Sequence, residues 1–320
     1  MASIVLGVGS SHGPSLENSP AEWPRLGERD KRDPRFNYQE LLKIAKPGLE
    51  AQITADVQSA RHAAARRSLQ QLSEIISGAR LDAVVIVSNP HRLRTGNNHP
   101  VFGIFRSATF PLERRSEEPF DPDFIFRPER ERRKEEIIEA PGQPDLANHL
   151  IASLIADGFD VACTDELPQG TTLDEAFAFP REWLFGGASL PSVPFLLSRV
   201  LPNQATPQRC YDLGLALRRA IEAWSVDARV GLVASGGLSH QVIDEELDQM
   251  AIGALVGNDV AALCNLPRAR LNRAPGTPEI LNWVTVAAAM APTGMTLVNY
   301  LPCYRSLAGT GQGLAFGYWM

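Results

Sequence analysis

The stretch Val84-Val85-Ile86-Val87-Ser88-Asn89-Pro90-His91 joins a continuous apolar run to small residues and then to a histidine. Two other stretches have the same construction, one from Ile4 to His12 and one from Val230 to His240. Continuous runs of Val, Ile and Leu are typical of strands that are covered on both faces. Ligands of open α/β sheets bind outside the carboxyl ends of the strands, so we expect the three histidines to share one site. The chain has 6 histidines, and half of them follow this pattern.

Strand-like runs alternate with helical patterns along the whole chain, which is typical of an α/β domain. No internal repeat, low-complexity linker or clear domain boundary interrupts the alternation. We therefore predict a single domain over residues 1–320, with a central mixed sheet flanked by helices and an active site at the strand carboxyl ends. Irregular stretches near residues 17–47 and 106–139 are candidate lids, because long loops often cover functional sites. We expect the stretch over residues 17–47 to be irregular, with one short helix.

Bulk composition excludes several classes of protein. The formal net charge of −6 and the pI near 5.6 argue against a nucleic-acid binder, which usually carries a basic face. The sequence contains no run of 18 or more apolar residues, so we expect no membrane span. The N-terminus lacks the pattern of a signal peptide. The 4 cysteines are far apart and form no Cys-x-x-Cys pair, which is typical of a reducing compartment. We expect a cytoplasmic protein.

The histidines at the strand ends indicate a metal site. Two imidazoles and one carboxylate form the facial triad of non-haem Fe(II) oxygenases. His12 and His91 could supply the imidazoles, and Glu279 is a candidate carboxylate. We expect Thr277 to be a helix N-cap and Pro278 the first helical residue, which places Glu279 in the first turn. An acidic residue there is also ordinary complementation of the helix dipole, so the spacing alone leaves both interpretations open.

His240 follows the glycine pair Gly236-Gly237, which lets the backbone approach a ligand or adopt positive φ. Held at a strand end, it could serve as a general acid–base. The alternative is a core histidine that bonds a loop carbonyl. His99 is a rival ligand close to His91, whereas His62 and His149 lie within helical patterns. No nucleophile elbow, Walker loop or complete dinucleotide fingerprint is present.

At these residues the chain resembles the class III extradiol ring-cleavage dioxygenases. This family includes the protocatechuate 4,5-dioxygenase catalytic subunits and the gallate and methylgallate dioxygenases. The resemblance is carried, in order, by Ser10-Ser11-His12-Gly13-Pro14, Val84 to His91, Gly142 to Ala147, Ser235 to Gln241, and Glu279. It implies that His12, His91 and Glu279 bind Fe(II) and that His240 is the acid–base histidine beside the metal.

The resemblance also implies the reaction. An aromatic diol and O₂ would meet at the iron, and the ring would open next to the two hydroxyls. Gln169 stands where the protocatechuate enzymes carry a further histidine, and Thr310 aligns with a substrate-contacting loop, so both are expected substrate contacts. The resemblance further implies a homodimer or larger homo-oligomer. Two alternatives remain open, namely a relative with DOPA-type cleavage and a protein that binds a small aromatic compound without turnover.

Overall fold

The computed structural model describes residues 1–91, 100–114, 136–167 and 172–320. Among these residues, a nine-stranded sheet forms the centre and a two-stranded sheet lies apart from it. The central strands are β1 (Ser3–Ser10), β2 (Ala83–Ser88), β3 (Phe102–Phe105), β6 (Ala162–Thr164), β7 (Ser192–Leu197), β8 (Arg229–Ser235), β9 (His240–Val242), β10 (Thr296–Tyr304) and β11 (Thr310–Trp319). The small sheet pairs β4 (Thr109–Arg114) with β5 (Glu136–Pro141).

The helices fill the connections between these strands. The α-helices are α1 (Pro14–Glu17), α2 (Trp23–Asp30), α3 (Tyr38–Lys43), α4 (Ala55–Ala79), α5 (Pro144–Ala156), α6 (Glu175–Phe179), α7 (Pro207–Ala223), α8 (Glu245–Gly257), α9 (Val260–Cys264), α10 (Arg268–Leu271) and α11 (Ile280–Met290). Short 3₁₀ turns are η1 (Pro20–Glu22), η2 (Leu49–Gln52) and η6 (Thr277–Glu279), and η5 (Pro180–Leu184) is a π turn. None of the described helices combines the length and the apolar character needed to cross a membrane.

The three predicted strand-then-histidine segments are neighbours in space. The strand order is β10-β11-β1-β8-β2-β7-β3-β6, with β9 paired to β11. Strand β8 lies between β1 and β2 and is parallel to both, and Ser10 lies opposite Ser235 at the carboxyl ends of β1 and β8. Strands β3, β9, β10 and β11 make antiparallel pairs, so the sheet is mixed as predicted.

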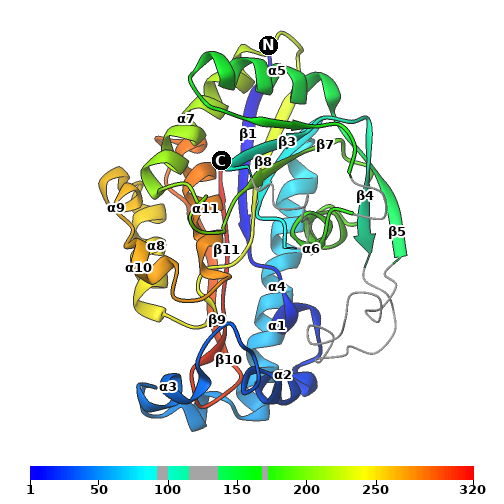
Figure 1. Ribbon diagram of the computed structural model, residues 1–320. Helices are drawn as coiled ribbons and strands as arrows, with labels where there is room; N and C mark the ends of the chain where they lie inside the picture. Colours follow the sequence, from blue (N-terminus) through cyan, green and yellow to red (C-terminus); the bar gives the residue numbers. More distant parts are fainter. Residues whose placement is uncertain (92–99, 115–135, 168–171) are drawn as a thin grey trace.

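Both faces of the sheet are covered by helices. In β2, Val84 and Ile86 belong to one core, whereas Val85 and Val87 belong to the other. Helices α4 and α6 lie on one face, and α7 and α11 lie on the opposite face (Figure 1). This two-sided burial explains why β2 reads as a continuous apolar run rather than as an alternating one.

The first predicted lid is more ordered than its sequence indicated. The prediction of an irregular stretch with one short helix over residues 17–47 was wrong, because η1, α2 and α3 all lie there. Trp23 and Leu26 of α2 are fully buried in the core beside α4. Asp30 bonds Arg305 through two contacts, at 2.6 and 3.1 Å. Helices this short are stabilised by tertiary packing rather than by propensity, so their residues carry little periodic signal.

Candidate metal centre

Three histidines from three strand ends converge on one carboxylate. Glu279 lies at the end of η6, directly before α11, and its side chain is fully buried. Its oxygens lie 2.9 Å from His91 Nε2 and 3.6 Å from His240 Nε2. The distance to His12 Nε2 is 3.8 Å. The structure thus brings together the four residues that the sequence placed in one site.

Two glycines make room for this approach. Gly236 has φ +137°, and a Cβ there would lie 2.7 Å from Glu279 Oε2. The next residue, Gly237, donates its N–H to the same oxygen at 3.1 Å. A Cβ on Gly276 would lie 2.1 Å from His240 Nε2. Larger side chains at Gly236 or Gly276 would collide with the cluster, so of the predicted pair Gly236 allows the close approach, and Gly276, which the sequence did not single out, allows a second one.

The predicted helix cap before Glu279 was wrong in detail. The N-cap residue of η6 is Gly276, and no side chain caps the turn. The Thr277 hydroxyl instead accepts the backbone N–H of His240 at 3.3 Å. Pro278 does lie in the first turn, and so does Glu279. Thr277 thus ties the His240 segment to the turn that carries the carboxylate.

His12 presents an unpaired ring nitrogen to Glu279. The Ser235 hydroxyl donates to the carbonyl of Ala176 at 2.7 Å, so it must accept from His12 Nδ1–H at 3.1 Å. The proton on Nδ1 leaves a lone pair on Nε2. This nitrogen is buried and has no hydrogen-bond partner among the described residues. A buried acceptor without a partner beside a carboxylate fits a metal ligand, because a bound cation would satisfy both groups.

His240 is held in the same tautomer. Its Nδ1 lies 3.3 Å from the carbonyl oxygen of Leu238, which can only accept, so Nδ1 carries the proton. Its Nε2 lone pair then faces the cluster. Burial lowers the pKa of His240 to about 4, against the opposing effect of Glu279. The ring is therefore neutral near pH 7 and can accept a proton.

His91 contacts a second carboxylate as well as Glu279. Its Nδ1 lies 3.0 Å from Glu175 Oε1, at the start of α6. Burial and Arg199 act to lower the pKa of His91, but its hydrogen bonds to Glu175 and Glu279 outweigh them and raise it to about 10. Burial acts to raise the pKa of Glu279, yet the facing histidines, His240 first, hold it well below its usual range. The cluster is thus arranged around a carboxylate that stays ionised.

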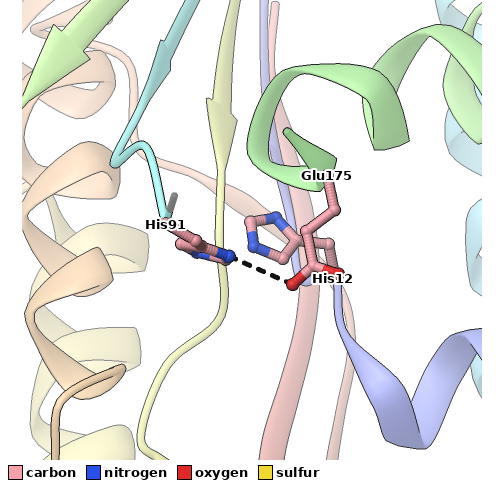
Figure 2. A group of neighbouring side chains, drawn as sticks. All are labelled: His12, His91 and Glu175. Carbon is pink, nitrogen blue, oxygen red and sulfur yellow. Dashed lines mark hydrogen bonds and ion pairs between the residues drawn. The ribbon is translucent and has the colours of Figure 1, made fainter. Parts of the chain in front are cut away.

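Ligand atoms of His12, His91 and Glu175 also lie within 4.8 Å of one another, a grouping that could hold a metal ion. Figure 2 shows these three side chains facing one another from the segments that follow β1 and β2 and from α6, with the bond between His91 and Glu175 dashed. Two carboxylates, Glu175 and Glu279, are therefore candidates for the carboxylate ligand. Glu279 is fully buried, whereas the Glu175 side chain is 36% exposed.

Sequence reasoning missed several polar residues of this site. Asp174 accepts the backbone N–H of His91 at 2.6 Å and also caps α6. Arg199, two residues after β7, lies 4.0 Å from Glu279 Oε1. Asp174 had a recognisable signal, because an Asp before a short helical run is typical of an N-cap. Arg199 follows an apolar strand, which is the same strand-end pattern that identified the histidines.

The two predicted substrate contacts have different outcomes. Thr310 is fully buried at the start of β11, and its hydroxyl bonds that of Ser306 at 2.7 Å. It pairs with Val242 across β9, two residues beyond His240. Gln169 lies outside the described residues, as does the rival ligand His99. The substrate-binding roles of Gln169 and Thr310 stay predictions.

Known proteins resemble this chain in part of their length. Residues 51–312 match the family model for the catalytic LigB subunit of aromatic ring-opening dioxygenase. A gallate dioxygenase of Pseudomonas putida is 32% identical over 167 residues, which make up 47% of this chain and 46% of that protein. A 2,3-dihydroxyphenylpropionate/2,3-dihydroxicinnamic acid 1,2-dioxygenase of Mycolicibacterium smegmatis is 31% identical over 144 residues. That match makes up 43% of this chain and 39% of the relative.

The alignments cover part of each relative and part of this chain. The chain spans less than half the length of each of these two curated relatives in its alignment. His12 precedes the region that the family model matches, so its place in the site rests on the geometry described above. A crystal structure of an uncharacterized protein from Escherichia coli K12 covers 98% of both chains at 15% identity, with a TM-score of 0.47.

Proposed function

Because the chain belongs to the family of catalytic LigB subunits of aromatic ring-opening dioxygenases, we propose that it is a non-haem Fe(II)-dependent extradiol dioxygenase. Its substrate would be a catecholic or gallate-like ring, opened next to the diol with insertion of O₂. One observation carries the proposal, namely the convergence of His12, His91 and His240 on the buried carboxylate of Glu279. Two imidazoles and one carboxylate are the donor set of non-haem iron oxygenases.

The chain's own residues divide the work. His12 and His91 would hold the ion through their Nε2 atoms, and Glu279 would hold it through a carboxylate oxygen. The bound Fe(II) would supply the place where the diol and O₂ exchange electron density. The unpartnered Nε2 of His12 supports a metal here rather than a purely structural cluster. Burial of His12 and Glu279 keeps water away, which limits the loss of reactive species.

His240 would move protons beside the metal. Its Nε2 faces the cluster with its lone pair, and its low pKa keeps that nitrogen unprotonated near pH 7. It takes the proton of a substrate hydroxyl, which makes the ring electron-rich, and later returns a proton to the opened product. A positioned group of this kind typically accelerates a reaction by about 10²–10⁴-fold.

Several finer points belong to the same proposal. Gln169 and Thr310 would contact the ring substituents, and the segments 17–47 and 106–139 would cover the site in cis. The buried Asp30–Arg305 pair supports a cover that stays docked rather than one that swings. A homodimer or larger homo-oligomer and a cytoplasmic location also stay our predictions, and light scattering of the purified protein would test the first.

Oxygen consumption tests the proposal directly. The protein is reconstituted with Fe(II) without air, then mixed with O₂ and with catechol, protocatechuate, gallate, 3-O-methylgallate or 2,3-dihydroxyphenylpropionate. We expect stoichiometric O₂ uptake and a new visible absorbance with at least one diol. The Zn(II)-loaded protein is the matched control and should consume no O₂. Iron binding without uptake for any diol would favour a binding protein or another reaction.

A further inference from the structure

Both ring nitrogens of His91 face a carboxylate, and the two carboxylates differ in their surroundings. Nε2 lies 2.9 Å from Glu279, and Nδ1 lies 3.0 Å from Glu175. Glu279 is fully buried and also lies within 4.0 Å of His12 and His240. Glu175 is 36% exposed and begins a five-residue helix. Glu279, and not Glu175, is therefore the carboxylate that lies within 4.0 Å of all three histidines.

The imidazole itself decides which nitrogen can bind a metal. A neutral ring has one N–H and one lone pair, so only one of the two nitrogens of His91 can be a ligand. Nε2 is on the side of Glu279, where the unpartnered Nε2 of His12 also lies. If the lone pair is on Nε2, then Nδ1 carries the proton and donates it to Glu175. Metal-bound histidines usually donate their other N–H to a carboxylate or a carbonyl in this way.

The backbone places Glu175 for this contact. The neighbouring Asp174 accepts the His91 backbone N–H through Oδ2 and the Ala176 N–H through Oδ1. One side chain thus joins the loop that follows β2 to the first turn of α6. The backbone at His91 and the backbone at the start of α6 are thus held next to each other. This brings the Glu175 side chain within hydrogen-bond distance of the His91 ring and fixes the direction in which the ring points.

We infer that Glu175 is a positioning residue that fixes the tautomer and orientation of His91 and is not itself a metal ligand. The inference rests on the proposed metal site, but not on the reaction or the substrate. Glu175 also makes His91 more basic by accepting its N–H, which strengthens the bond from Nε2 to a cation. The interaction needs an acceptor at this position more than it needs a full charge.

Metal titration separates the two roles of a carboxylate. Co(II) is titrated without air into the metal-free protein against a chelator, and the dissociation constant and the visible Co(II) spectrum are recorded. Glu175→Ala should bind Co(II) about 10–100-fold more weakly, as expected for loss of a group that supports a ligand. Glu175→Gln should recover most of the affinity, because its amide oxygen accepts the same N–H. Both variants should keep the wild-type Co(II) spectrum, since the ligands are unchanged.

Two outcomes would overturn the inference. Affinity unchanged in Glu175→Ala would show that the contact does no positioning, and complete loss of Co(II) in both variants would make Glu175 a ligand. Glu182→Gln, which changes an exposed carboxylate further along the same segment, is the control and should bind as wild type. Circular dichroism confirms the fold of each variant. For any variant that fails this check, ¹⁵N NMR of the imidazoles in the Zn(II)-bound wild type decides, since the inference requires the single N–H of His91 to be on Nδ1 when the metal is bound.

The experiment also separates this inference from the proposed function. Co(II) affinity is read without substrate or O₂. If the variants behave as expected but no diol is consumed by the iron form, the reaction assignment fails and the role of Glu175 stands. If the metal-free protein binds no divalent ion at all, both fail together.

Discussion

The two sides of the histidine cluster are built differently. The inner wall consists of Glu279 on η6, Gly237 between β8 and β9, and His240 at the start of β9, and it is buried. The outer wall consists of Asp174 and Glu175 at the start of α6, where Glu175 is 36% exposed. The inner wall holds an ionised carboxylate in a fully buried position, whereas the outer wall contacts His91 through a backbone N–H and a ring N–H. The difference indicates that the inner wall supplies charge and the outer wall supplies orientation.

The largest effect is expected at the centre of the inner wall. Glu279→Gln keeps the size of the side chain but removes the charge that faces three histidines. Because loss of a supporting group alone costs about 10–100-fold in metal affinity, loss of this ligand should cost more than about 100-fold. Iron per chain after gel filtration measures the effect. If Glu279→Gln retained iron as well as Glu175→Gln does, the two walls would not differ in the proposed way.

His240 tests a separate role on the same wall. His240→Ala should keep its iron but lose about 10²–10⁴-fold in kcat, because the proton acceptor is gone while the ligands remain. Steady-state O₂ uptake and iron content, measured on the same sample, show the two properties side by side. His149→Gln, on α5 and bonded to the carbonyl of Ala220, is the control and should turn over normally. A normal kcat in His240→Ala would contradict the acid–base assignment.

Asp248 bonds Ser239, the residue that precedes His240 of the inner wall. It is fully buried and accepts the Ser239 N–H, the Ser239 hydroxyl and the Tyr300 hydroxyl, each at 2.7 Å. Asp248→Ala leaves these donors without a partner and should lower the free energy of unfolding by about 3 kcal/mol, since each unpaired buried group costs about 1–3 kcal/mol. Urea unfolding measures the loss. Tyr300→Phe removes a single donor and should cost about 1 kcal/mol.

The same carboxylate predicts a pH dependence. Burial raises the pKa of Asp248 from 3.8 to about 7. The folded protein then binds more protons at this site than the unfolded chain does between these values, so the contribution of Asp248 is present at low pH and lost as pH rises through about 7. The stability of wild type relative to Asp248→Asn should therefore fall from pH 4 to pH 7. A difference that stayed constant over this range would contradict the raised pKa.

The sequence predicted the inner wall better than the outer one. The apolar runs of β1, β2 and β8 are long enough to identify buried parallel strands, and parallel strands bring their following histidines to one edge. Glu279 could not be chosen from the pattern, because an acid in a first turn has an ordinary explanation. Helix α6 has five residues, which are too few to show a helical period in the sequence. Contacts such as those of Asp174 and Glu175 with His91 cross more than 80 residues of sequence, which no local pattern records.

The smallest expected effect on metal binding lies on the outer wall and separates its two functions. Asp174→Ala removes both the cap of α6 and the acceptor of the His91 N–H, so it should cost about 1 kcal/mol of stability for the cap and about 1–3 kcal/mol more for the unpaired donor. Asp174→Asn keeps an oxygen for the Ala176 N–H, but it places an amide where Oδ2 accepts the His91 N–H. It should therefore cost about 1–3 kcal/mol of stability, because the His91 N–H loses its acceptor, and it should bind Co(II) less than about 10-fold more weakly, the lower end of what supporting groups contribute. Thermal unfolding and Co(II) titration measure the two effects. Unchanged Co(II) binding in Asp174→Asn would mean that the ring contact with Glu175 alone orients His91. A full loss of Co(II) binding would mean that Asp174 contributes its negative charge to the metal site, as the inner wall does, and not only the orientation of His91.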